Sequence, residues 1–154
     1  MTNVDADPVE LGFIASPARP GSNVTGFTGI AHDLAAKRLA LLKELVPNAK
    51  RVGMLVGTTI GGPALTGAGL AHYRGTESAA RKLGMEIRLL RVQTPEELER
   101  LVGGTVDWRP DVLSVFSGSW FNTHRARIID WVARMKLPAI YSNVAYVEYG
   151  ALMA

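Results

Sequence analysis

The segment "RVGMLV", residues 51–56, begins with arginine and continues as a short run of apolar residues. Three similar runs follow, each separated from the next by enough chain for a helix: "EIRLLRV" (86–92), "DVLSVF" (111–116) and "PAIY" (138–141). Short apolar runs of this kind are typical of strands buried on both faces, and strands that alternate with helices pair in parallel through right-handed crossovers. The sequence therefore predicts an α/β fold, a three-layer sandwich with a mostly parallel, flavodoxin-like sheet.

The order of the strands follows from the same alternation. The order 2-1-3-4-5 is common in such sheets, so we expect strand 51–56 to lie between strands 86–92 and 111–116. Residues 151–154 are predicted to add the last strand.

Capping residues and apolar faces predict the helices. Asp33 is expected to cap a helix that ends before Pro47 and whose apolar face consists of Leu34, Leu41, Leu42 and Leu45. A second helix near 71–83 is predicted to stop at Gly84.

Two further helices are predicted after residue 93. Thr94 and Glu97 form a capping box with Pro95 at the first helical position. A helix over about 123–136 places three apolar residues on one face, namely Ile128, Val132 and Met135.

Composition excludes several classes of protein. At 154 residues and 47% hydrophobic, the chain has the length for one ordinary core. It has no cysteine, which excludes disulfides, thiol nucleophiles and cysteine-ligated zinc. The net charge of +3 comes from scattered residues, so we expect no nucleic-acid partner. No apolar run spans a bilayer, and the acidic start of the chain as given does not resemble an export signal.

The motifs of enzymes and nucleotide-binding proteins are incomplete. The glycine-rich segment "GTTIGGPALTGAG" (57–69) lacks both the P-loop Lys-Ser/Thr and the G-x-G-x-x-G spacing. Ser117 and Ser119 precede His124, but the G-x-S-x-G elbow is absent. His32 and His72 lack metal-ligand spacing and are interpreted as surface or helix-start residues. We predict no catalytic residue, no cofactor and no metal.

Ligands of open parallel sheets bind outside the carboxyl ends of the strands, where the connecting loops converge. In this sequence those loops hold hydroxyl and aromatic side chains, which suit a small organic ligand. The predicted cleft surface consists of Thr58, Thr59, Ser117, Ser119, Trp120 and Tyr141.

Three long segments carry a family resemblance. These are "DADPVELGFIASPARPGSNVTGFTG" (5–29), "LAAKRLALLKELVPNAKRVGML" (34–55) and "THRARIIDWVARMKLPAIYSNVAYVEYGALMA" (123–154). They resemble the substrate-binding proteins of ABC transporters, in the family that includes tryptophan- and other aromatic-amino-acid-binding lipoproteins. The similarity runs along nearly all of the chain.

The resemblance implies a type I periplasmic-binding-protein fold, in which two α/β lobes hold the ligand between them. Residues 1–29 would then form the interlobe connection and cleft rim, with Asn23 and Thr25 at the rim. Residues 30–154 would form a single ligand-binding lobe, so the chain covers about one lobe. The full-length protein would be periplasmic, or extracytoplasmic and membrane-anchored, and would deliver a small solute, such as an amino acid, to the permease of an ABC importer.

A lone lobe is expected to bind its solute weakly or undetectably, since it offers only one wall of the cleft. It is also expected to form a homo-oligomer, because the surface that faced the other lobe would be exposed. That surface is predicted to include Trp120, Phe121, Tyr141 and Tyr146.

The alternative is a small flavodoxin-like α/β enzyme or a receiver-like signalling module. A receiver needs acidic residues at the carboxyl ends of its strands, where this sequence has Thr, Ser and Tyr. A flavin enzyme would be coloured, so absorbance of the purified protein distinguishes it.

Overall fold

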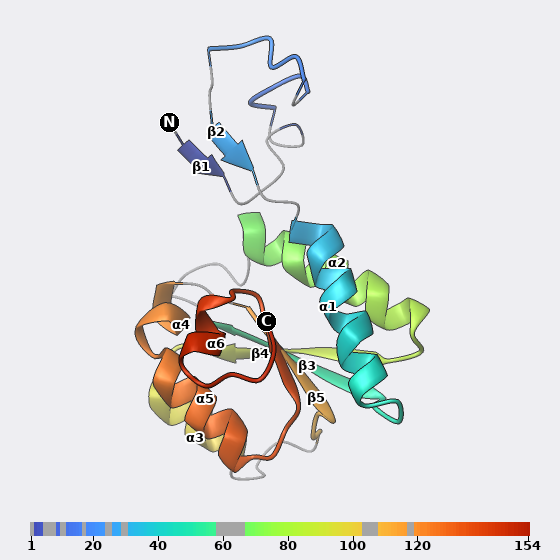
Figure 1. Ribbon diagram of the computed structural model, residues 1–154, viewed down its shortest axis with the longest axis vertical. Coiled ribbons are helices and arrows are strands. Elements are labelled where there is room, and N and C mark those ends of the chain that lie inside the picture. Colours follow the sequence, from blue (N-terminus) through green and yellow to red (C-terminus); the bar gives the residue numbers. More distant parts are fainter. Residues whose placement is uncertain are drawn as a thin grey trace.

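The central feature of the computed structural model is a four-stranded sheet whose strands are all parallel. The described residues are 2–4, 9, 12–16, 18–23, 26–28, 31–57, 67–102, 108–116 and 119–154. The strands are β3 (Arg51–Gly57), β4 (Glu86–Val92), β5 (Val112–Val115) and β6 (Ala139–Tyr141), in the order β4-β3-β5-β6. The prediction that the first of these strands lies between the next two is confirmed (Figure 1).

Helices cover both faces of this sheet. They are α1 (Ala31–Leu45), α2 (Gly67–Lys82), α3 (Pro95–Val102), α4 (Ser119–Thr123), α5 (Arg125–Arg134) and α6 (Ala145–Glu148). Helices α1 and α2 lie together on one face, whereas α3 and α5 lie on the other (Figure 1). The predicted three-layer α/β sandwich is therefore confirmed.

Each face of the sheet has its own core cluster, because successive side chains along a strand point to opposite sides. On the α1/α2 side, helix residues such as Leu39, Leu42 and Ala80 belong to one cluster with Val52 and Val112. On the other side, Leu98, Ile128, Trp131 and Val132 of α3 and α5 belong to one cluster with Leu55, Leu113 and Val115. This two-sided burial explains why the strands are apolar without alternation.

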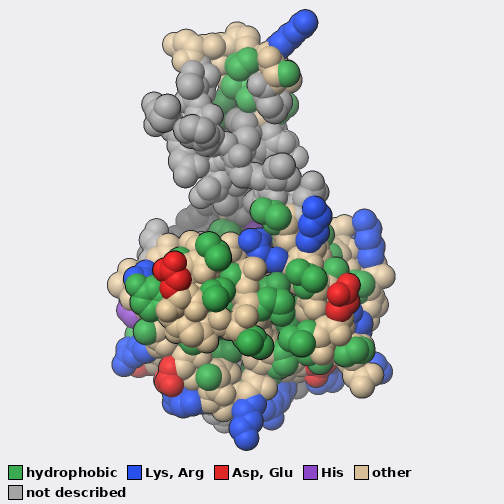
Figure 2. Space-filling model, viewed as in Figure 1, with side chains coloured by type: hydrophobic (Ala, Val, Ile, Leu, Met, Phe, Trp, Pro, Cys, Tyr) green, Lys and Arg blue, Asp and Glu red, His purple; other side chains and the backbone are tan. Residues whose placement is uncertain are grey.

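The buried face of α1 differs from the predicted one. Its buried residues are Ala35, Leu39 and Leu42, whereas Leu34, Leu41 and Leu45 are 45%, 51% and 53% exposed. The helix starts at Ala31, so Asp33 lies within it and is not its cap. Leucines lie on two neighbouring sides of this helix, and only the side that meets α2 and the sheet is covered. Figure 2 shows hydrophobic side chains spread over the face of the molecule that carries α1 and α6.

The predicted helix ends agree better with the structure. The Glu97 N–H donates to Thr94 Oγ1 at 3.3 Å, and the Glu97 carboxylate accepts from the Gln93 N–H at 2.7 Å. The first bond is that of the predicted capping box, whereas the second differs from it, because the carboxylate of a capping box accepts from the N-cap N–H and here it accepts from the preceding residue. Helix α2 is followed by Gly84 with φ +66°, the left-handed conformation that ends a helix.

The two ends of the chain complete the fold. Residues 151–154 are not a strand, so that prediction is wrong, although the Tyr141 N–H donates to the Met153 carbonyl at 3.1 Å. At the other end, β1 (Thr2–Val4) and β2 (Gly26–Thr28) form a separate parallel two-stranded sheet. Figure 1 shows this small sheet apart from the four-stranded one, beyond the start of α1.

Within the described ranges, no helix has the length and apolarity needed to cross a lipid bilayer.

Candidate functional site

The candidate site is the carboxyl edge of the four-stranded sheet. Because all four strands are parallel, β3, β5 and β6 end at the same edge, at Gly57, Val115 and Tyr141. The next residues are anchored on neighbouring strands: the Phe116 N–H donates to the Leu55 carbonyl at 3.0 Å, and the Ser142 N–H to the Val115 carbonyl at 3.0 Å. The edge therefore offers a fixed backbone on which a ligand surface can be built.

Helix α4 adds an aromatic wall to this edge. The Trp120 ring stacks on His124 with centroids 4.5 Å apart, and it meets Phe121 edge-on at 5.2 Å. Phe121 is fully buried and lies against the end of β3, whereas Trp120 is only half-buried. A partly exposed ring held between two others is a suitable platform for stacking with a flat ligand.

Helices α1 and α2 contribute polar groups on the other side of the sheet. Arg38 Nη2 donates to the carbonyl of Ser142, the first residue after β6, at 3.1 Å. His72 is 2% exposed, its Nε2 lies 3.5 Å from Ser114 Oγ, and its ring lies 5.1 Å from the Phe116 ring. The α1/α2 side of the edge thus combines one cation with neutral polar and aromatic groups.

Burial sets the charge of these groups. Burial, and secondly the positive charge of Arg38, lowers the pKa of His72 to about 4, so this imidazole is neutral at pH 7. Burial also lowers the pKa of the Arg38 guanidinium, which nevertheless stays protonated at pH 7. Arg38 is therefore a partly desolvated positive charge at the carboxyl edge of the sheet.

A hollow lies at the carboxyl end of β4, on the same edge of the sheet but at the border away from β6. Its volume is about 310 Å³, and it is lined by Arg91, Gln93, Glu97, Arg100 and Leu101. The Glu97 carboxylate is already engaged at the start of α3. Within the described ranges, no group of three or more His, Asp or Glu residues could hold a metal ion.

The structure describes only part of the predicted cleft surface. Trp120 lies at the carboxyl edge with its ring partly exposed, as the prediction requires. Asn23 is exposed, and Ser119 is the first residue of α4. The remaining polar candidates, Thr25, Thr58, Thr59 and Ser117, lie outside the described residues.

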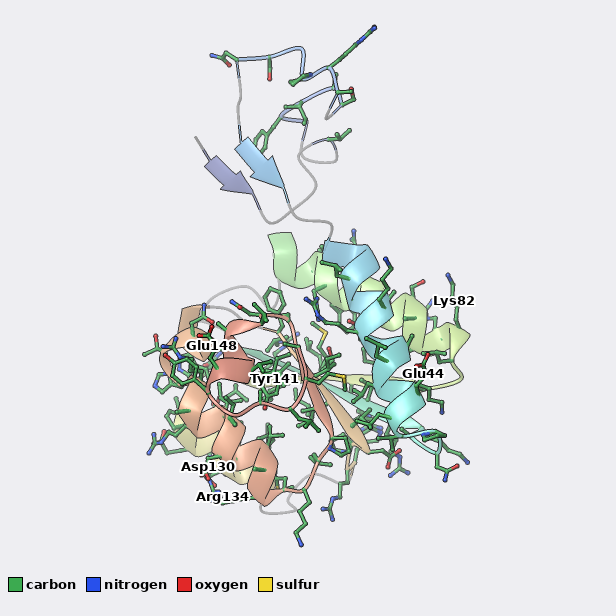
Figure 3. The ribbon with its side chains drawn as sticks, in the orientation of Figure 1. Glu44, Lys82, Asp130, Arg134, Tyr141 and Glu148 are labelled. Atoms are coloured by element: carbon green, nitrogen blue, oxygen red, sulfur yellow. The ribbon has the colours of Figure 1, made fainter. Side chains whose placement is uncertain are left out.

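Tyr141 lies at this edge but not on its surface. The Tyr141 side chain is 2% exposed and stacks on Tyr146, with ring centroids 4.9 Å apart. Figure 3 shows Tyr141 in the interior, among the elements around the four-stranded sheet. Phe121 and Tyr146 are also buried, so the prediction that these three residues line an exposed face is wrong. The reason is that α4 and α6 pack their aromatic residues into the core cluster shared with α5.

Arg38 is not among the predicted site residues, and His72 is buried rather than at the surface as predicted. For Arg38 a signal existed. It follows Leu34 by four residues and precedes Leu41 by three, so it lies within the predicted apolar stripe of α1. A charge within a stripe that is predicted to be buried indicates a residue with a specific partner, although the structure leaves Leu34 and Leu41 of this stripe exposed.

Comparison with known proteins identifies the family. Residues 2–154 match the sequence profile of a family described as ABC transporter substrate binding protein. The chain belongs to this family of substrate-binding proteins. Members of the family are binding proteins rather than enzymes and are extracytoplasmic.

Individual proteins are similar over almost the whole chain. A tyrosine-binding protein from Clostridioides difficile (strain R20291) is 29% identical over 152 residues, which is 99% of this chain and 41% of that protein. An ABC domain in complex with L-Trp from Streptococcus pneumonia has a TM-score of 0.72 at 22% identity, over 97% of this chain and 50% of that one. A ligand-free, open substrate-binding protein with adhesive properties from Clostridium difficile has a TM-score of 0.68 at 25% identity, over 97% of this chain and 48% of that one. The chain therefore spans about half the length of these proteins.

Proposed function

We propose that this chain is one lobe of a two-lobe solute-binding protein of an ABC importer, and that its solute is an aromatic amino acid. The observation that carries the proposal is the partly exposed Trp120 ring at the carboxyl edge of the sheet, where ligands of open parallel sheets bind. An aromatic platform suits a solute with a ring, as tyrosine and tryptophan have. The relatives named for tyrosine and L-Trp support this choice of solute.

The two-lobe arrangement rests on length. The chain spans 50% of the L-Trp-bound protein and 41% of the tyrosine-binding protein, which suits one lobe of each. In this proposal residues 30–154 form the lobe, and residues 1–29 form the interlobe connection and cleft rim. The separate pairing of β1 with β2 is consistent with that division.

Family membership supports the proposed importer role. A binding protein that closes on its solute presents both lobes to a membrane partner, which here is the permease of the importer. We therefore propose a periplasmic location, or membrane anchorage on the outer side, for the full-length protein.

Titration of the ¹⁵N-labelled chain with L-tryptophan tests the proposed function. We expect saturable chemical-shift changes at the amides of Phe116, Trp120, Ser142 and Asn143, which follow the strand ends or lie on α4. The affinity is expected to be weak, in the range of about 1 mM, because one lobe provides only part of the contact area.

Two results would contradict the proposal in different ways. Micromolar binding of L-tryptophan by this chain alone would show that a second lobe is unnecessary. Saturable changes confined to residues away from the carboxyl edge, or no changes at all, would refute the site. L-Alanine, which lacks a ring, provides the matched control and is expected to give no saturable change.

Self-association of this chain is part of the proposal, but its surface differs from the predicted one. The exposed stripe of Leu34, Leu41 and Leu45 on α1 is the apolar surface that a second copy would cover. Light scattering after gel filtration is expected to give a mass above the monomer, and Leu41→Glu is expected to restore the monomer. Leu152→Glu is the control, since Leu152 is 84% exposed but lies on the carboxyl-terminal tail. A wild-type monomer at high concentration would refute self-association.

A further inference from the structure

The position of Arg38 suggests which part of the ligand this lobe recognises. Arg38 lies on α1, and its Nη2 reaches the Ser142 carbonyl just beyond the end of β6. This contact holds the guanidinium at the carboxyl edge of the sheet. Because a guanidinium has five N–H donors, this bond leaves others that can point toward a ligand.

Among the residues whose side chains the structure describes, Arg38 has no carboxylate partner. The ion pairs there are Arg81 with Glu77, Arg88 with Glu86, and Arg134 with both Glu99 and Asp130. None of these four ion pairs includes Arg38 or Ser142. Arg38 therefore resembles a charge whose anion is supplied from outside the lobe.

The groups near Arg38 do not replace that anion. His72 lies close enough to interact with the Arg38 charge and is neutral, and its other neighbours are the Ser114 hydroxyl and the Phe116 ring. A partly buried cation is unfavourable unless it is paired. An arginine with a free planar face of donors binds a carboxylate through two parallel hydrogen bonds, which is its strongest pairing.

We propose that Arg38 binds the carboxylate of the solute and so makes this lobe selective for carboxylate-bearing aromatic ligands. This inference rests on the proposed function, in which the solute is an aromatic amino acid. Trp120 would then bind the ring, and Arg38 would fix the orientation of the acid group.

The test compares two ligands that share the indole ring, on the ¹⁵N-labelled chain. L-Tryptophan has a carboxylate and tryptamine lacks it. The wild-type chain is expected to bind L-tryptophan about tenfold or more tightly than tryptamine, since hydrogen bonds between two charged groups are the strong ones. Arg38→Gln is expected to bring the two affinities within about twofold, and Arg38→Lys to keep part of the preference.

The matched control is Lys37→Gln, which removes a neighbouring, exposed positive charge from the same helix. It is expected to keep the preference for L-tryptophan, which excludes a general effect of net charge. A wild-type chain that binds both ligands equally, or an Arg38→Gln variant that keeps the preference, would overturn the role of Arg38 while leaving the proposed function intact. Failure of both ligands to bind the wild-type chain would overturn the proposed function and this inference with it. The spectrum of each variant also reports whether it is folded.

Discussion

Replacing Trp131 with alanine is expected to lower the free energy of unfolding by about 3–5 kcal/mol. Trp131 lies on α5, is 2% exposed, and belongs to the core cluster that joins α3, α5, β6 and α6. Its removal leaves a cavity that the surrounding helices can fill only partly. Since a domain of this size is stable by about 5–15 kcal/mol, the loss is a large share of the total. Urea unfolding followed by far-UV circular dichroism measures it.

Trp131→Phe is the matched control for this cavity. Phenylalanine keeps an aromatic ring at the position and removes the indole N–H, which has no hydrogen-bond partner within the described ranges. Because an unsatisfied buried donor is unfavourable, its loss offsets part of the lost volume. We expect the phenylalanine variant to lose well under half of what the alanine variant loses. If the two variants lose the same free energy of unfolding, or if Trp131→Ala loses none, the Trp131 ring does not fill the core in the way described.

The strands were predictable from the sequence because their signal is local. Strand β3, for example, is buried from Val52 to Val56, so a continuous apolar run marks it. Parallel pairing and the order of β4, β3 and β5 then follow from helix-strand alternation and right-handed crossovers. The capping box of α3 is also a local pattern: its Thr94 bond is present, whereas the Glu97 carboxylate accepts from the N–H of Gln93, the residue before the N-cap.

Features that depend on distant contacts were not predictable in the same way. Leucines surround much of α1, so the sequence does not reveal that Leu39 faces inward and Leu41 outward. The carboxyl-terminal tail reads as a strand, but Gly150 with φ +96° turns the chain and the Ala151 N–H donates to the Tyr146 carbonyl. The tail therefore forms a local bond to α6 and a backbone bond from Tyr141 of β6 to Met153, but no paired strand.

The candidate site likewise contains one residue that local sequence predicts and others that only distant contacts place. Trp120 could be proposed because it follows a predicted strand directly, and the structure places its ring partly exposed at that edge. Arg38 reaches the edge from a helix 104 residues earlier in the sequence than its partner Ser142, and His72 approaches Ser114 from 42 residues away. Single-sequence patterns carry no information on such pairings.

Replacing Gly57 with alanine is expected to destabilise the protein by about 1–3 kcal/mol, which is the usual cost of overpacking. Gly57 ends β3 beneath α4, and a Cβ atom there would lie 2.6 Å from Phe121 Cδ2 and 2.7 Å from Phe121 Cε2. The same atom would lie 3.4 Å from the Cβ of Trp120. Because Phe121 is fully buried, its ring has no free space to enter, so α4 or the end of β3 must shift.

A double-mutant cycle with Phe121→Leu isolates this contact. Leucine lacks the ring atoms that obstruct the new methyl group, so Gly57→Ala is expected to cost less in the Phe121→Leu background, with a coupling free energy of about 0.5–3 kcal/mol. Unfolding free energies of the four proteins in urea give the coupling, and an equal cost in both backgrounds would show that the Phe121 ring is not the obstacle.

The same cycle tests the site, because Trp120 is the preceding residue of α4. If its ring binds the solute as proposed, Gly57→Ala weakens L-tryptophan binding by displacing α4, and the additional Phe121→Leu change restores part of it.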